Sequence, residues 1–257
     1  MITLTTDFGT KDPYVAEMKG VILTINPKAT LIDITHEVEK FNVRMAAFML
    51  ASAAPYFPKD TVHLAVVDPG VGTQRRAILV QTKMGFFVGP DNGVLMLAAQ
   101  NQGILSIHQL VNPKFMLPKV SSTFHGRDVF APAAAYLDSS VKPQEFGSEI
   151  NDAVKPDFAS VMRRNGSLIG EVLHVDGFGN VITNIKQEEM IDAKIVDVKL
   201  PNVSLKLALG KTYAEAKPQE PIALIGSHGF MEIALNQGSA AEKFNVKTGD
   251  KVEITTA

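Results

Sequence analysis

The chain has 257 residues, of which 46% are hydrophobic and 20% are charged, and its formal net charge is −2. This composition suffices for a large hydrophobic core and excludes a disordered or fibrous protein. The small net charge, without any run rich in Lys and Arg, leaves no electrostatic footprint for nucleic acid or an anionic membrane surface. A small molecule is therefore the expected partner.

The sequence contains no cysteine, which excludes disulfides, zinc–thiolate sites, iron–sulfur clusters and a cysteine nucleophile. Residues 1–7 predict a strand rather than a signal peptide. No window approaches the ~18 uninterrupted apolar residues that a membrane span requires. We therefore expect a cytoplasmic protein that does not enter a membrane.

In the first part of the chain, apolar runs alternate with segments of helical period, a pattern typical of β/α units around a mainly parallel sheet. Residues 1–6 and 31–34 predict strands, and residues 14–26 and 42–54 predict helices. The wholly apolar run at residues 62–67 predicts a central strand that is covered on both faces.

Two further strands are predicted at residues 77–81 and 86–88, and the turn sequence Gly-Pro-Asp-Asn-Gly at residues 89–93 ends the second of them. Residues 131–137 predict another helix. Asp128 lies just ahead of this helix, and its simplest interpretation is an N-terminal cap.

Residues 139–165 are mixed and polar, which suits a linker. From residue 168 onward the apolar runs become short strands divided by Gly, Asn and Pro, a signature of a small antiparallel barrel or sandwich. The predicted fold class is therefore α/β. An N-terminal α/β domain with a mainly parallel sheet occupies residues 1–155, and residues 156–257 hold the linker and a smaller C-terminal antiparallel β-barrel domain.

Three polar runs follow strand-like segments, at residues 66–76 (VVDPGVGTQRR), 122–128 (STFHGRD) and 176–184 (DGFGNVITN). Such loops, where strands end, hold the chemistry of α/β folds. Taken singly, Asp68 is an ordinary turn residue, Arg75 a solvated charge and His125 a loop histidine. Convergence of the loops would favour catalysis over these interpretations, and an enzyme is the leading hypothesis.

No metal site is predicted. His63 and His108 lie within strand-like runs and His36 lies in a turn, and none of them has a second ligand at metal-binding spacing. Satisfied structural histidines are the favoured interpretation.

Seven blocks follow one another along almost the whole chain: TLTTDFG (3–9), DITHEV (33–38), VVDPGVGTQRR (66–76), VGPDNG (88–93), STFHGRDVFAPAAA (122–135), DGFGNVITNI (176–185) and GSHGFMEIALNQGSAA (226–241). Together they resemble the S-adenosyl-L-methionine (SAM) hydroxide adenosyltransferase family, also called SAM hydrolases, which are relatives of the SAM-dependent fluorinase and chlorinase. The resemblance implies an α/β domain followed by a β domain, and conversion of SAM and water to adenosine and L-methionine. It also implies that no cofactor is needed, and that the protein is a homotrimer with its sites at subunit interfaces.

The resemblance places a water-activating set on Asp68, Arg75 and His125. The residues that it places against the substrate are Asp7 for the ribose, Asp176 and Ser227 for the methionine part, and Phe178, Asn180, Asn236 and Gly238 for the adenine side, with Asn184 and Glu232 as further members. Phe41 and Phe178 are expected to give the pocket an apolar lining. The family's usual Asp-Arg-Phe-Gly-Asn run has Gly177 in place of the Arg here, so that contact is absent.

These residue types suit the chemistry. Attack at C5′ of a sulfonium expels a neutral thioether, so the leaving group needs no general acid. Water has a pKa of roughly 15.7, and its activation is expected to come from His125 as base, Asp68 as the orienting group and Arg75 as a source of positive field.

Two alternatives remain open at this stage. A halogenating relative would use the same SAM pocket but would need a small hydroxyl and backbone N–H groups to hold a halide, and would have little use for an Asp–Arg–His set. A non-catalytic sensor of adenosine or SAM would share every pocket residue and would release no product.

Overall fold

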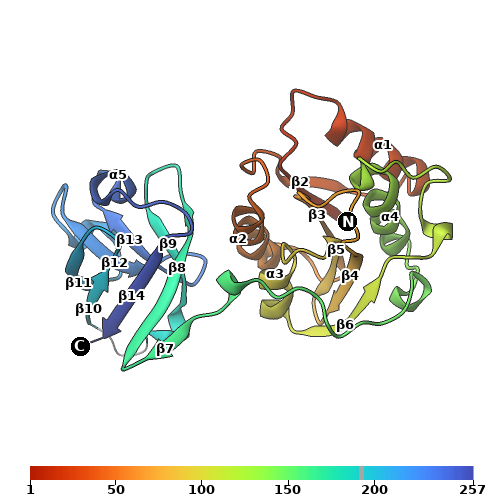
Figure 1. Cartoon of the computed structure of the whole chain (residues 1–257). Coiled ribbons are helices and arrows are strands. Elements are labelled where there is room, and N and C mark those ends of the chain that lie inside the picture. The colour runs from red at the N-terminus through yellow and green to blue at the C-terminus, as the bar shows by residue number, and fades with distance from the viewer. Residues whose placement is uncertain (191–193, 257) are drawn as a thin grey trace. The chain divides into compact units, whose positions relative to one another are not determined.

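The computed structural model describes residues 1–190 and 194–256. The chain divides into two compact units, Met1–Pro156 and a second that begins at Asp157 (Figure 1). Each unit has a hydrophobic core of its own.

The first unit contains one six-stranded sheet in the order β2-β1-β3-β5-β4-β6. Its strands are β1 (Ile2–Thr6), β2 (Leu31–Thr35), β3 (Thr61–Val66), β4 (Ala77–Thr82), β5 (Gly85–Pro90) and β6 (Ile104–Gln109). Strands β2, β1, β3 and β5 are parallel to one another, whereas β4 is antiparallel to both of its neighbours. The mainly parallel sheet predicted from the sequence is confirmed.

Helices cover both faces of this sheet. They are α1 (Tyr14–Ile25), α2 (Val43–Ala53), α3 (Met96–Gln102) and α4 (Ala131–Asp138). Helix α1 packs beside α4, and α2 packs beside α3 on the opposite face (Figure 1). Every residue of β1 and β3 is therefore buried, as expected for strands that are covered on both sides.

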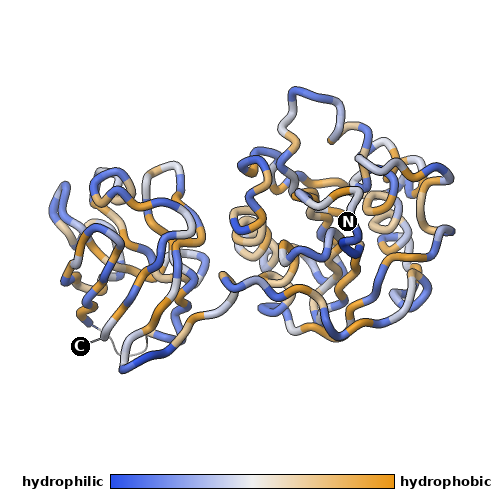
Figure 2. The backbone as a smooth tube through the Cα atoms, in the orientation of Figure 1, coloured by the Kyte–Doolittle hydropathy of each residue, from blue (hydrophilic) through white to orange (hydrophobic). Residues whose placement is uncertain are grey.

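Hydrophobic residues concentrate in the strands and helices, whereas the loop that leads into α1 is hydrophilic (Figure 2). Short 3₁₀ turns complete the connections of the two units: η1 (Ala54–Tyr56), η2 (Pro113–Phe115), η4 (Pro143–Glu145), η5 (Asp157–Ala159), η6 (Gln187–Glu189) and η7 (Tyr213–Glu215).

The helix predicted over residues 131–137 is confirmed as α4, but a further helical turn that was not predicted precedes it. A π-helical turn, η3 (Gly126–Phe130), runs directly into α4, because Val129 and Phe130 are buried in the core and extend the apolar helix face upstream. Asp128 consequently lies inside the helical run and is not its N-cap. The buried Asp128 carboxylate accepts hydrogen bonds from the Ser121 backbone N–H at 2.8 Å and from the Arg127 side chain at 2.7 Å.

The expected linker is shorter than its polar composition indicates. Phe146 is 1% exposed and packs against Phe115 with ring centroids 4.6 Å apart. The backbone N–H of Gln109 donates to the Ser148 carbonyl at 3.0 Å. The segment that follows α4 therefore belongs to the first unit.

The second unit is a closed barrel. Its strands are β7 (Met162–Arg164), β8 (Ser167–Val175), β9 (Val181–Lys186), β10 (Ile195–Lys199), β11 (Ser204–Gly210), β12 (Pro221–Ile225), β13 (Phe230–Leu235) and β14 (Lys251–Thr256), and the short helix α5 (Ala240–Phe244) accompanies them. The order is β14-β10-β11-β12-β13-β9-β8-β7, and pairing of β14 with β8 closes seven strands into a ring. The predicted barrel is confirmed, although β11 and β12 form a parallel pair within it.

Across residues 1–190 and 194–256, no helix is both long enough and apolar enough to cross a membrane.

Candidate active site

The first two expected site carboxylates follow adjacent parallel strands. Thr6 of β1 pairs with Val66 of β3 at the carboxyl ends of the two strands. The chain adds β2 on one side of β1 and later β3 on the other, so the strand order reverses between β1 and β3, which is where open α/β sheets bind ligands. Asp7 comes directly after β1, and Asp68 comes two residues after the end of β3.

The loop after β3 folds back tightly on itself. The backbone N–H of Val71 donates to the Asp68 carbonyl at 3.2 Å, and the Thr73 hydroxyl donates to the Gly70 carbonyl at 2.7 Å. This turn chemistry returns the chain so that Arg75 lies beside Asp68.

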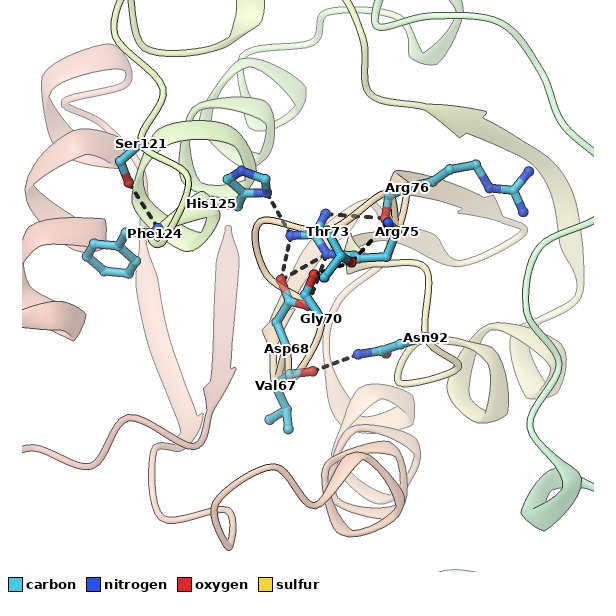
Figure 3. Close-up of polar contacts among 10 residues, drawn as sticks. All are labelled: Val67, Asp68, Gly70, Thr73, Arg75, Arg76, Asn92, Ser121, Phe124 and His125. Atoms are coloured by element: carbon cyan, nitrogen blue, oxygen red, sulfur yellow. Dashed lines mark hydrogen bonds and ion pairs between the residues drawn. The ribbon is translucent and has the colours of Figure 1, made fainter.

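Arg75 joins the two other residues of the expected water-activating set (Figure 3). Its Nε lies 3.0 Å from each carboxylate oxygen of Asp68, and its Nη2 donates both to Asp68 Oδ2 and, at 2.8 Å, to Nδ1 of His125. The guanidinium carbon also lies 5.2 Å from the centre of the Phe130 ring. The side chains of Asp68 and Arg75 are only 6% and 10% exposed, so solvent screens this ion pair weakly.

The contact with Arg75 fixes the protonation state of His125. Because a guanidinium only donates hydrogen bonds, Nδ1 must accept, and the neutral ring then carries its hydrogen on Nε2. Burial lowers the pKa of His125, and the positive charge of Arg75 lowers it further, against the opposing charges of Asp68 and Asp128. The imidazole is therefore neutral at pH 7, with Nε2–H as a hydrogen-bond donor.

The two loops that carry Asp68 and His125 touch through a glycine. Gly72 has a φ of +78°, and a Cβ at this position would lie 2.4 Å from the Ser122 carbonyl oxygen. Glycine alone combines this backbone conformation with so close an approach. Gly72 thus allows the loop after β3 to lie against the loop before η3.

A cavity of about 570 Å³ opens at this place, within the range usual for small-molecule sites. Asp68 and His125 line it together with Asp7 and Phe41, whereas Arg75 is not one of the lining residues. The Asp7 carboxylate is held by the Phe41 backbone N–H at 2.9 Å, and the Lys40 ammonium donates to the Asp7 carbonyl. Phe41 has a φ of +65° and a side chain that is largely exposed.

Three aromatic side chains of this cavity were not expected from the sequence. Phe8, Tyr14 and Phe124 meet edge to face, with ring centroids 5.3 to 5.8 Å apart. The guanidinium of Arg127 lies 5.0 Å from the Phe124 ring centre and forms an ion pair with Glu17 at 2.8 Å. No local sequence signal joins residues so far apart along the chain.

The second unit has its own cavity of about 630 Å³, which Asp176, Phe178, Asn180 and Gly238 line. Asp176 Oδ1 accepts the backbone N–H groups of Phe178 and Asn180, each at 2.9 Å, and Oδ2 accepts the Asn180 amide at 2.8 Å. Asp176 thereby organises the turn before β9, and the Phe178 ring is left 82% exposed at the rim.

Tyr213 lines the same cavity and was not expected from the sequence. Its hydroxyl donates to Glu232 Oε2 at 3.0 Å. Burial, reinforced by the nearby charge of Glu232, raises the pKa of Tyr213 to about 12. Burial also raises the pKa of Glu232, and the charge of Asp176 adds to this effect.

Three other residues that were expected to contact the substrate, Asn184, Asn236 and Ser227, do not line this cavity. Both amide hydrogens of Asn184 are donated to backbone carbonyls, those of Phe158 at 3.2 Å and Ser160 at 2.9 Å. The Asn236 amide donates to the Ala216 carbonyl at 2.7 Å. Ser227 lies exposed in the turn between β12 and β13.

Within the described part of the chain, no cluster of three or more His, Cys, Asp or Glu side chains is arranged to hold a metal ion.

An α/β unit followed by a β unit is the architecture that the sequence resemblance implies, and the structure has this architecture. The chain belongs to the SAM hydroxide adenosyltransferase family: residues 2–147 match the N-terminal domain of that family and residues 170–253 match its C-terminal domain.

Individual relatives agree. A protein of Methanocaldococcus jannaschii named (R)-S-adenosyl-L-methionine hydrolase is 40% identical over 99% of this chain and 95% of its own length. A protein of Actinopolyspora mzabensis named fluorinase is 26% identical over 99% of this chain and 97% of its own length. A crystal structure of a conserved protein from Thermotoga maritima has a TM-score of 0.89 and 42% identity, and the match covers 99% of this chain and all 100% of that one.

Proposed function

We propose that this protein hydrolyses SAM to adenosine and L-methionine. The observation that carries the proposal is the contact of Arg75 with both Asp68 and His125 at the wall of the first cavity. The 40% identity to a protein named (R)-S-adenosyl-L-methionine hydrolase supports the same conclusion.

In the proposed reaction the oxygen of water attacks C5′ of SAM. The C5′–O bond forms as the C5′–S bond breaks, and the electron pair of that bond goes to sulfur, which leaves as the neutral thioether of methionine. The water loses one proton, so the products are adenosine, L-methionine and H⁺. Since the sulfonium loses its charge, a partly apolar cavity favours the reaction.

The geometry refines the expected roles of the three residues. Arg75 does not line the cavity and donates hydrogen bonds to both partners, which makes it a positioning residue. In this proposal the Nε2–H of His125 donates a hydrogen bond to the water oxygen, and the carboxylate of Asp68, which also lines the cavity, accepts a hydrogen bond from the water. Base action by His125 at Nδ1 would require its bond to Arg75 to break.

The remaining residues are proposed to hold the substrate. Asp7 holds the ribose, and the exposed ring of Phe41 covers the sugar at the cavity rim. In the second unit Asp176, with its backbone turn, holds the methionine part, and Phe178 and Asn180 take the adenine. No additional cofactor enters this scheme, because SAM itself supplies the activated carbon.

The direct test is incubation of the purified protein with SAM, followed by chromatographic separation of adenosine and methionine in equal amounts. Arg75→Ala and His125→Ala should lower the rate of adenosine formation at least ~10²-fold, and both variants should still fold. Arg75→Ala should also lower the melting temperature, because it leaves the buried Asp68 carboxylate without its ion-pair partner. Arg164→Ala, at an exposed position of β7, is the control and should retain the wild-type rate. Binding of SAM without release of either product would instead identify a sensor.

We further propose that the protein forms the homotrimer that the family resemblance implies, with more than one subunit contributing to each site. The support is the division of the proposed substrate contacts between the two units. Light scattering should then give about three times the chain mass of 27.8 kDa.

A further inference from the structure

Two adjacent residues in the turn after β5 hold both ends of the loop that carries Asp68 and Arg75. At the entry to the loop, Nδ2 of Asn92 donates to the Val67 carbonyl at 2.8 Å (Figure 3). Val67 lies between the last residue of β3 and Asp68. Its carbonyl therefore belongs to the peptide group that joins Val67 to Asp68, the residue whose carboxylate is proposed to act in the reaction.

At the exit from the loop, the neighbouring residue Asp91 makes the corresponding contacts. Its backbone N–H donates to the Arg76 carbonyl at 3.0 Å, and its carboxylate accepts from Nε of Arg76 at 2.8 Å. The Asp91 side chain is 3% exposed. Arg76 points away from the Asp68 and His125 side chains (Figure 3), so its ion pair anchors the loop without entering the site.

The side chain of Asn92 is itself fixed. Its Oδ1 accepts the backbone N–H of Val94 at 3.1 Å, an Asx-type contact that orients the amide plane and directs Nδ2 at Val67. A serine at this position could keep the short contact to Val94 but could not reach Val67. An aspartate would set a carboxylate oxygen against the Val67 carbonyl oxygen.

We propose that Asn92 is a positioning residue for the reaction, which sets the direction of the Asp68 carboxylate through the Val67 peptide. This inference rests on the proposed hydrolysis of SAM. Asn92 is not among the residues that line the cavity, so it acts on Asp68 and not on the substrate. A displacement of about 1 Å at a reacting group costs on the order of 10²-fold in rate, whereas substrate binding is unaffected.

The chain offers a matched control in Asn112. Its Nδ2 donates to the Glu145 carbonyl at 2.7 Å and its Oδ1 accepts the Lys114 backbone N–H at 3.1 Å, so it repeats the hydrogen-bond pattern of Asn92 in the same unit. Neither Asn112 nor its two partners lines the cavity. Replacement of either asparagine by serine therefore removes the same kind of contact.

The experiment measures kcat and KM for SAM, together with the melting temperature, in wild type, Asn92→Ser, Asn92→Asp and Asn112→Ser. We expect Asn92→Ser to lower kcat at least tenfold and Asn92→Asp to lower it further, with KM within threefold of wild type. Asn112→Ser should lower the melting temperature by about as much as Asn92→Ser does, but should leave kcat within twofold of wild type.

An active wild type with unchanged kcat in Asn92→Ser, or with an equal loss in Asn112→Ser, would overturn the positioning role and leave the proposed function intact. Failure of both Asn92 variants to fold, while Asn112→Ser folds, would also overturn it, because Asn92 would then be structural. A folded wild type that forms no adenosine would refute the proposed function itself.

Discussion

Nη2 of Arg75 donates to Nδ1 of His125 across 2.8 Å, and this contact leaves the imidazole hydrogen on Nε2. The same guanidinium binds Asp68 through both carboxylate oxygens. Asp68 and His125 line the same cavity, where we propose that the His125 Nε2–H and the Asp68 carboxylate hold the attacking water.

The first prediction separates a donor role of His125 from a base role. His125→Gln places an amide N–H near the position of Nε2 and should retain at least a tenth of the wild-type kcat. His125→Ala, which removes the donor, should lose ~10²-fold or more. Rates of adenosine formation measured at pH 7 on folded variants provide the comparison. Equal losses in the two variants would favour general-base action by the imidazole.

The second prediction concerns the contact between the two loops. Gly72→Ala should destabilise the protein by at least ~2 kcal/mol, because the added Cβ meets the Ser122 carbonyl at 2.4 Å and the φ of +78° is strained for alanine. Gly166→Ala is the control: Gly166 has a φ of +82° with nothing near its Cβ position, so only the backbone strain of about 1 kcal/mol applies. Urea unfolding measures both. Equal losses would mean that the loops do not touch as described.

The third prediction concerns acid stability. Burial lowers the pKa of His63 from 6.5 to about 4, and His63 stacks on Phe87 at 4.9 Å and contacts the Thr3 hydroxyl at 2.8 Å. Between these two pH values the unfolded chain binds the proton and the folded chain does not. The contribution of His63 is therefore complete above pH 6.5 and is lost as the pH falls to about 4, by roughly 3 kcal/mol.

The variant His63→Asn isolates this effect. The difference in unfolding free energy between wild type and His63→Asn, measured by urea titration at several pH values, should shrink as the pH falls from 6.5 to 4. A constant difference across this range would show that His63 does not titrate between the folded and unfolded states.

The sequence predicts much of this fold because its patterns are local. The apolar run of β3 and the helical period of α1 each define one element, and the short strands after residue 168 indicate a barrel. The predicted N-cap role of Asp128 was wrong, because Asp128 lies inside the π-helical turn η3 ahead of α4 and its carboxylate accepts hydrogen bonds from Ser121 and Arg127.

The contacts of the candidate site are harder to predict from local sequence patterns. The contact between Arg75 and His125 joins positions 50 residues apart, and only the resemblance to a family indicated that they meet. No sequence pattern indicates two further contacts of the cavities, which are the aromatic cluster of Phe8, Tyr14 and Phe124 and the hydrogen bond between Tyr213 and Glu232. They depend on tertiary packing that brings separate loops together.

The fourth prediction concerns the proposed trimer. The chain with Asp7→Ala and His125→Ala, and the chain with Asp176→Ala and Asn180→Ala, should each be inactive alone. If each site draws on two subunits, refolding the two chains together should restore part of the activity, since some sites would then combine two intact sets. Proven exchange of subunits without any recovery would mean that one chain supplies the whole site.

Delivery of water to C5′ of SAM at this site can be tested by mass spectrometry of the products formed in ¹⁸O-labelled water with chloride and fluoride in excess. We expect adenosine with one ¹⁸O at the 5′-hydroxyl, unlabelled L-methionine and no 5′-halogenated nucleoside. Formation of 5′-chloro- or 5′-fluoro-5′-deoxyadenosine, or of adenosine without the label, would contradict it.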